Sequence, residues 1–307
     1  MKIRIGFDIT VERIGRTSLV LCLLPFPTEM TRIDAPAGVD LTPPPSSGDG
    51  NAVPYTDTFG NHCLRVPEGT GPLRLRWDAV VQDSGLPDQV DATARAIPID
   101  ELPPETLQFL LPSRFCESDM LLADAWARFG SVPEGWARVQ AVCTYVHHHI
   151  EFGYHHAAPT KSALDVWRVG RGVCRDYAHL TITLLRALNM PARYVSGYLG
   201  DIGVPYAGPG DFCAWVEVFV GGTWRTVDAR FNRPRIGRVV MVRGRDAADV
   251  PMITAFGNLR MDKFTVWCDE LPELENSAEI PHPSQMTGNA ADPLPVSSVS
   301  AGFWGNR

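Results

Sequence analysis

Residues 170–180 read Gly-Arg-Gly-Val-Cys-Arg-Asp-Tyr-Ala-His-Leu, a run in which glycines give way to a nearly all-apolar segment. The segment continues to Leu188 and is followed by Asn189-Met190-Pro191, which predicts a buried helix that begins at Cys174. The positive end of a helix dipole, on the order of +0.5 e, favours a thiolate over a thiol with the ordinary cysteine pKa of about 8.5. Cys174 is therefore the candidate nucleophile.

The segments after this helix have the composition of strands, at 192–199, 212–220, 223–230 and 239–242, with a last strand around 264–268. Gly221-Gly222 is a two-residue hairpin signal between the second and the third. If Val220 pairs with Thr223, Cys213 and Asp228 share a face as diagonal neighbours. Their Cβ atoms would then lie roughly 6 to 8 Å apart.

The rest of the chain divides by periodicity. Alternating apolar residues at 3–11 and 73–81 predict a small β-sandwich over residues 1–84, followed by a linker over 85–104. Helical patterns start near 105, with helices expected over 118–129 and after a capping box at Ser131-x-x-Glu134. We therefore expect an α+β core over 105–270 and a poorly packed tail over 271–307, which is rich in Pro, Ser, Asn and Ala.

The composition and the net charge argue against several classes of partner. The 307 residues are 45% hydrophobic and 21% charged, which is typical of a globular protein with ample core. A net charge of −7 without a basic aromatic stripe argues against nucleic acid and anionic membranes as partners. No apolar run approaches the roughly 18 residues of a membrane span. Seven cysteines without a Cys-x-x-Cys pair indicate reduced thiols and a cytoplasmic location.

Several motifs together carry a resemblance to a known family. The run around Cys174, then Pro-Ala-Arg-Tyr-Val-Ser-Gly-Tyr at 191–198, Ala-Trp-Val-Glu-Val at 214–218 and Asp228 resemble the bacterial transglutaminase-like (cysteine protease) family. Residues 1–84 resemble the N-terminal domain that often precedes this core in bacteria, and 234–250 resemble its distal part. The resemblance implies a papain-like core, with a helix bundle that carries the cysteine packed on an antiparallel sheet.

The resemblance also implies a Cys-His-Asp reacting set. Cys174 and Asp228 match the cysteine and the aspartate, whereas Cys213 occupies the histidine position. A thiol cannot orient on the aspartate or protonate a leaving amine near neutral pH as imidazole does, and losing acid-base help costs about 10² to 10⁴ in rate. Arg230, expected opposite Cys213, would favour a thiolate by charge but cannot move a proton.

Other side chains are candidates to replace the missing base or to contact the substrate. His155 and His156 precede the nucleophile in a loop and stay open as a replacement base, although solvent-exposed loop histidines are the plainer interpretation. His179 lies about 140° around the helix from the thiol and is expected in the core. Trp215, Trp167 and Arg230 are the candidate substrate contacts, with packing as the alternative for the tryptophans. We expect no metal and no cofactor.

The leading hypothesis is a cysteine hydrolase or acyltransferase that acts on amide bonds of a peptide or protein substrate through a Cys174 acyl-enzyme. One alternative is an inactive protein that keeps the fold as a binding or scaffolding module. Another is a redox switch formed by Cys174 and Cys213. The sequence leaves the acyl acceptor, water or an amine, and the oligomeric state open.

Overall fold

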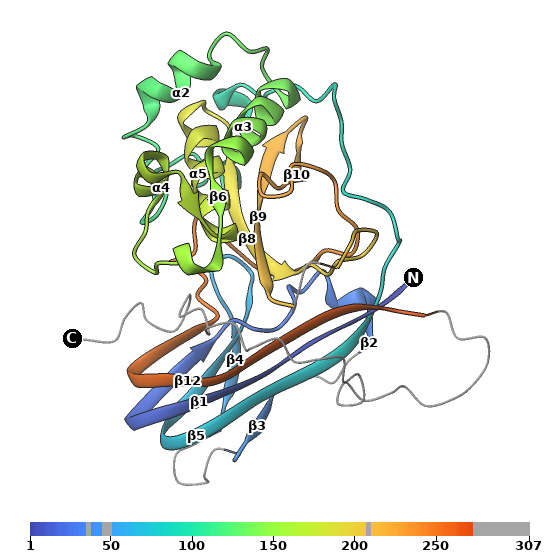
Figure 1. Cartoon of the computed structure of the whole chain (residues 1–307), viewed down its shortest axis with the longest axis vertical. Coiled ribbons are helices and arrows are strands. Elements are labelled where there is room, and N and C mark those ends of the chain that lie inside the picture. The colour runs from blue at the N-terminus through green and yellow to red at the C-terminus, as the bar shows by residue number, and fades with distance from the viewer. Residues whose placement is uncertain (35–37, 45–50, 207–209, 273–307) are drawn as a thin grey trace.

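The computed structural model describes residues 1–34, 38–44, 51–206 and 210–272. Their strands form a six-stranded, a four-stranded and a two-stranded sheet. Figure 1 shows the helices gathered around the four-stranded sheet at one end of the molecule, with the long strands of the six-stranded sheet at the other. The α+β class predicted from the sequence is confirmed.

Three long strands dominate the six-stranded sheet: β1 (Lys2–Leu21), β5 (His62–Gln82) and β12 (Ile253–Leu271). The order is β12-β1-β5-β2, and β3 and β4 also pair with β5; the short strands are β2 (Ile33–Asp34), β3 (Asp40–Thr42) and β4 (Val53–Thr56). The alternation predicted for residues 3–11 holds, because Ile3, Ile5, Phe7, Ile9 and Val11 are all fully buried. The strands of residues 1–84 join one sheet rather than the two facing sheets of a sandwich.

The strand expected around 264–268 forms, but it belongs to the six-stranded sheet and not to the core region. It lies inside β12 and pairs with β1, with Cys268 opposite Ile5 and Phe264 opposite Ile9. Alternating apolar residues fix which face of a strand is buried, not which sheet it joins. The chain therefore leaves the core region before residue 270 and returns to the first sheet.

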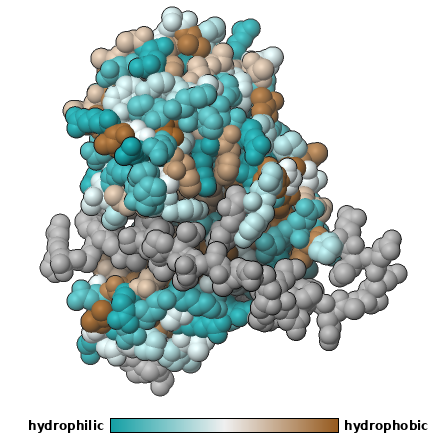
Figure 2. All heavy atoms as spheres, viewed as in Figure 1, coloured by the Kyte–Doolittle hydropathy of each residue, from teal (hydrophilic) through white to brown (hydrophobic). Residues whose placement is uncertain are grey.

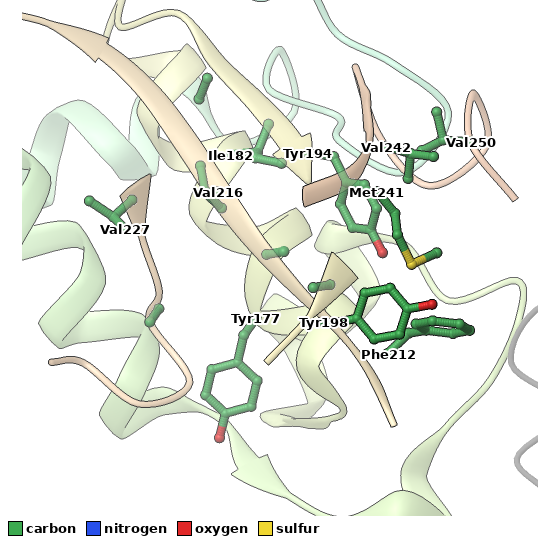
Figure 3. Packing of buried hydrophobic residues seen from close by; sticks show 14 of the residues in the cluster. Tyr177, Ile182, Tyr194, Tyr198, Phe212, Val216, Val227, Met241, Val242 and Val250 are labelled. Atoms are coloured by element: carbon green, nitrogen blue, oxygen red, sulfur yellow. The ribbon is translucent and has the colours of Figure 1, made fainter. Parts of the chain in front are cut away.

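The core sheet has the order β10-β9-β8-β11 and is antiparallel throughout. Its strands are β8 (Ala192–Tyr198), β9 (Phe212–Val220), β10 (Thr223–Val227) and β11 (Val239–Gly244). The predicted hairpin register is confirmed, since Thr223 pairs with Val220 and Val227 with Val216. Helix α5 (Cys174–Ala187) begins at the predicted residue and packs on β9 and β8, as part of the apolar cluster in Figure 3.

Helices α2 (Leu122–Phe129), α3 (Trp136–His149) and α4 (Ala163–Val169) contact α5, and the short helix α1 (Pro104–Leu107) precedes them in the chain. Two-residue strands β6 (Glu151–Phe152) and β7 (Arg171–Gly172) pair in parallel just before α5. The predicted capping box is wrong, because α3 begins only at Trp136, after Gly135 in the left-handed region at φ 87°. Glu134 instead lies 3.5 Å from Arg138 as an ion pair.

The first sheet and the core region share one interface. The Phe212 ring of β9 packs edge-on against Phe7 of β1 at 6.3 Å and Phe264 of β12 at 5.9 Å between ring centroids. The linker contributes Asp88, whose carboxylate accepts from Arg238. The expected tail lies, from residue 273 onward, outside the described residues.

Figure 2 shows apolar residues scattered among hydrophilic ones over the described part of the visible face. Among the helices that the structure describes, none is both long and apolar enough to cross a membrane.

Replacement of Gly197 by alanine should destabilise the core sheet. An added Cβ would lie 2.1 Å from the carbonyl oxygen of Val239 and 2.9 Å from Cη2 of Trp215. Neither neighbour has room to move inside the sheet, so we expect Gly197→Ala to lower the free energy of unfolding by about 1 to 3 kcal/mol. Urea denaturation measures the change. Gly38→Ala is the control, since a Cβ there meets nothing within 4 Å; equal midpoints for the two variants would contradict the close packing.

Candidate active site

Cys174 is the first residue of α5, and it is only half-buried while the rest of that helix is buried. Asp176 fixes the helix start, because its carboxylate accepts from the Val173 N–H at 2.8 Å. The pKa of Cys174 is lowered from its ordinary value, foremost by the side-chain interaction with Cys213 and also by the positive charge of Arg230, against the opposing effect of burial. The nucleophile assigned from the sequence therefore has thiolate character.

Cys213 lies in β9, in a cluster against which Cys174 packs. It is 5% exposed and lies in an apolar cluster with Val195, Trp215 and Val240. Its pKa is raised well above the ordinary value because its proton is held in the hydrogen bond to Cys174, and burial acts in the same direction. The Cys213 sulfur lies 3.9 Å from Nη1 of Arg230. In this pair the proton stays on Cys213 and negative charge collects on Cys174.

Asp228 lies directly after β10 and is held on both carboxylate oxygens. Its Oδ1 accepts from the backbone N–H of Arg230 at 3.0 Å, and its Oδ2 accepts from Nη2 of Arg238 at 2.9 Å. Arg238 also binds Asp88 at 2.9 Å and lies over the Trp215 ring, 4.8 Å from its centroid. The carboxylate expected to orient a base is thus the partner of a buried arginine.

Two cavities meet at the thiol pair. Cys174 lines a cavity of about 90 Å³ together with Tyr194, Ser196 and the β12 residues Met261 and Phe264. Cys213 and Arg230 line a second cavity of about 610 Å³. Three residues line both cavities: Tyr154, Asp211 and Phe212. Residues of β9, β12 and the segment before α4 therefore form walls of the cavity beside Cys174.

Among the described residues that line either cavity there is no histidine. His155 is exposed and His156 half-buried, and their rings pack against each other at 3.8 Å, although the neighbouring Tyr154 reaches both cavities. His179 is fully buried as expected, stacked on Phe115 at 5.1 Å. Burial holds the pKa of His179 well below its usual value, so the ring is neutral.

Three consecutive histidines end α3, and their rings contact different partners. His147 Nδ1 lies 3.0 Å from the carbonyl oxygen of Ala229, in the turn that follows Asp228. His148 Nδ1 lies 2.7 Å from the Thr144 carbonyl oxygen, and His149 Nε2 lies 2.9 Å from that of Trp167. The His147 ring therefore contacts the backbone of the turn that follows Asp228.

The three predicted substrate contacts lie in different parts of the structure. Arg230 lines the larger cavity, with its guanidinium 4.0 Å from the centroid of the Phe152 ring. Trp215 is 1% exposed and packs under Arg238, which is the packing alternative. Trp167 stacks near Tyr145 at 5.5 Å and does not appear among the described residues that line the two cavities. The structure brings only Arg230 of the three to the thiol pair.

Sequence reasoning missed Asp211. This half-buried residue precedes β9, two positions before Cys213, and burial raises the pKa of its carboxyl to about 6. Its negative charge contributes to the raised pKa of Tyr154, and at Cys174 it opposes the lowering of the pKa without reversing it. The alternation of an extended strand was the available signal, since residues 211 and 213 project to the same side. Arg238 was missed too, because nothing in its spacing indicates a partner at residue 228.

Comparison with known proteins agrees with this geometry. Residues 123–229 match the model of the transglutaminase-like superfamily core, a span that includes Cys174, Cys213 and Asp228. An uncharacterized protein of Mycobacterium leprae is 41% identical over 95 residues, which are 29% of this chain and 33% of that protein. An uncharacterized protein of Mycobacterium tuberculosis is 36% identical over 97 residues, 28% of this chain and 31% of that protein. The matched segment spans about a third of the length of these relatives.

A solved structure covers far more of the chain. The crystal structure described as a Putative Cysteine Protease from Cytophaga hutchinsonii superposes with a TM-score of 0.74 at 26% identity. The superposition covers 92% of this chain and 94% of that one. The similarity therefore extends across both the six-stranded sheet and the core region.

Removal of the Arg238 guanidinium should destabilise the protein strongly. Asp228 and Asp88, with side chains 2% and 15% exposed, would lose the cation that they share. We expect Arg238→Met to lower the free energy of unfolding by about 3 to 5 kcal/mol, because it leaves two buried carboxylates without the arginine that balances their charge. Thermal and urea unfolding measure it. Arg260→Met, which breaks an exposed pair with Asp262, should stay near wild type; similar losses in both variants would refute a special role for Arg238.

Proposed function

Because residues 123–229 carry a transglutaminase-like core, we propose that the protein is a cysteine hydrolase or acyltransferase whose Cys174 forms an acyl-enzyme with a peptide or protein substrate. The observation that carries this proposal is the polarised thiol pair. A thiolate is the reactive form of cysteine, and here a hydrogen bond from Cys213 and the charge of Arg230 both favour it. We also propose a cytoplasmic location, in keeping with seven free cysteines.

In the proposed reaction the Cys174 sulfur attacks the acyl carbon of a substrate held in the cavity beside α5. Negative charge then develops on the acyl oxygen near the start of the helix, where the helix dipole favours an anion. Collapse of this intermediate expels the leaving group and leaves a thioester on Cys174. Water or an amine then accepts the acyl group and frees the sulfur.

Expulsion of an amine is the difficult step at this site. An amine leaves only after it has received a proton, and imidazole usually supplies it. Cys213 is a poor donor because its pKa is raised well above that of a free thiol. We therefore propose slow turnover of amides, with a deficit of about 10² to 10⁴ relative to a site with a histidine.

A binding or scaffolding module is the second candidate, and the state of Asp228 favours it. Its two oxygens accept from Arg238 and from the backbone of its own turn, and among the described residues no histidine lines the cavities beside it. On this alternative the two cavities would hold a peptide that is not cleaved. Any turnover that disappears in Cys174→Ala would exclude it.

Alkylation tests the nucleophile directly. With its pKa lowered, Cys174 should be thiolate at a lower pH than a free cysteine, so at pH 6 iodoacetamide should modify it at least about tenfold faster. Peptide mass mapping assigns the site. Cys116 and Cys143, whose pKa values burial raises to about 12, are internal controls and should stay unmodified. A Cys174 rate equal to that of free cysteine would remove the basis of the proposal.

Cys213→His tests whether only the base is missing. An imidazole at this position would lie between the Cys174 sulfur and Asp228. We expect hydrolysis of a peptide-amide substrate to rise by about 10²-fold, because the imidazolium can protonate the leaving amine. Cys213→Ala is the matched control and should show no gain. If the histidine variant folds, alkylates rapidly at Cys174 and still fails to gain activity, the missing base is not the limiting defect and the binding module is favoured.

A further inference from the structure

We infer that Asp211 is the general base that releases the acyl group from Cys174, and that the site therefore turns over esters and thioesters in preference to amides. This inference rests on the proposed acyl-enzyme. It assigns a role to a residue outside the Cys-His-Asp pattern, and it names the class of substrate.

The position of Asp211 is the first argument. Of the described residues, Asp211 is the one carboxylic acid that lines the cavity containing Cys174, and it also lines the larger cavity with Cys213 and Arg230. It enters β9 two residues, or about 7 Å of extended chain, ahead of the position that the resemblance gives to a histidine. A water between Asp211 and Cys174 would be within reach of both groups, and a general base can act on such a water directly.

The surroundings of Asp211 are the second argument. Arg230 faces it from the turn after β10, Tyr154 from the segment after β6, and Cys174 from α5. Among the described residues none forms an ion pair with Asp211 within 4.0 Å, unlike Asp228, which Arg238 holds. Asp201 and Asp269 lie farther along the larger cavity and do not line the smaller one. Asp211 is thus available for proton transfer where Asp228 is not.

The ionisation of Asp211 suits a base rather than an acid at neutral pH. Burial raises the pKa of its carboxyl to about 6, so it is mostly ionised at pH 7 yet still holds a proton far better than an exposed aspartate. The carboxylate form exists above that pKa and is lost below it. Deacylation should therefore speed up as the pH rises through about 6.

Deacylation is the hydrolysis of the Cys174 thioester, with Asp211 as the base. The Asp211 carboxylate takes one proton from a water, and the water oxygen forms a bond to the carbonyl carbon of the thioester. The carbon–sulfur bond then breaks, its electron pair returns to Cys174 as the thiolate, and a carboxylic acid is released. Asp211 passes its proton to solvent and is again a carboxylate. No oxidant or metal enters the step.

The preference for esters follows from the acylation step. An alkoxide, phenolate or thiolate is a better leaving group than an amine and needs less proton transfer, so a preformed Cys174 thiolate can expel it without an imidazolium. Asp211 is ionised at pH 7 and cannot replace that acid. The site therefore supports both halves of ester or thioester hydrolysis but only the second half of amide hydrolysis.

Burst kinetics with p-nitrophenyl acetate separate the two halves. Wild type should release about one p-nitrophenolate per protein rapidly and then turn over at a steady rate that rises through pH 6. Asp211→Asn should keep the rapid burst, because acylation does not use Asp211. Its steady rate should fall by about 10²-fold and lose the pH dependence, and mass spectrometry should find an acetyl group on Cys174. Asp211→Glu should restore part of the rate.

Controls make the outcomes distinct. Asp262→Asn removes a surface carboxyl that lines neither cavity and should behave as wild type. Wild-type steady rate and pH profile in Asp211→Asn, with a burst that Cys174→Ala abolishes, would overturn the role of Asp211 while leaving the acyl-enzyme intact. A wild-type protein without any burst, or with one that survives in Cys174→Ala, would overturn the proposed function itself. Faster turnover of a matched amide than of the ester would overturn the substrate class.

Discussion

The hydrogen bond between two thiols is the interaction on which the chemistry of this site depends. The interaction lowers the pKa of Cys174 and raises that of Cys213, so one sulfur keeps its proton while the other gains thiolate character. The bond exists only because α5 packs on β9 in a fixed register, with the first residue of the helix against the second residue of the strand. Arg230 adds a cation beside the pair without competing for the proton. The packing of α5 on β9 therefore determines which of the two sulfurs carries negative charge.

The first sheet is part of this site. Phe212, the neighbour of Cys213, lies between Phe7 of β1 and Phe264 of β12, and Phe264 also lines the cavity of the nucleophile. The return of the chain to β1 after the core strands thus places a wall of the cavity. A core cut off before residue 253 would lack that wall, which gives a physical reason for the two parts to share one interface.

The sequence predicted well what local chemistry decides. The start of α5 at Cys174, the hairpin register around 221–222 and the burial of His179 follow from apolar runs, turn residues and helix geometry. It could not predict which sheet β12 would join, because alternation fixes a face and not a partner. It also missed Asp211, whose position in the cavities depends on a segment far away in sequence, around Tyr154. Strand alternation places Asp211 on the same side as Cys213, but it carries no signal for the contact with that distant segment.

Replacement of a histidine by a cysteine does more than delete a base. An imidazolium between Cys174 and Asp228 would bring one positive charge to two anions, whereas the thiol brings none. In this chain Arg238 neutralises Asp228, and Arg230 lies beside the sulfurs. Both are permanent cations, so the charges are balanced but no proton can be moved between them. A site balanced in this way holds an anionic nucleophile well, and it needs a separate, titratable group for any step in which a proton must move. The half-buried carboxyl of Asp211, with its pKa near 6, is such a group in the same cavity.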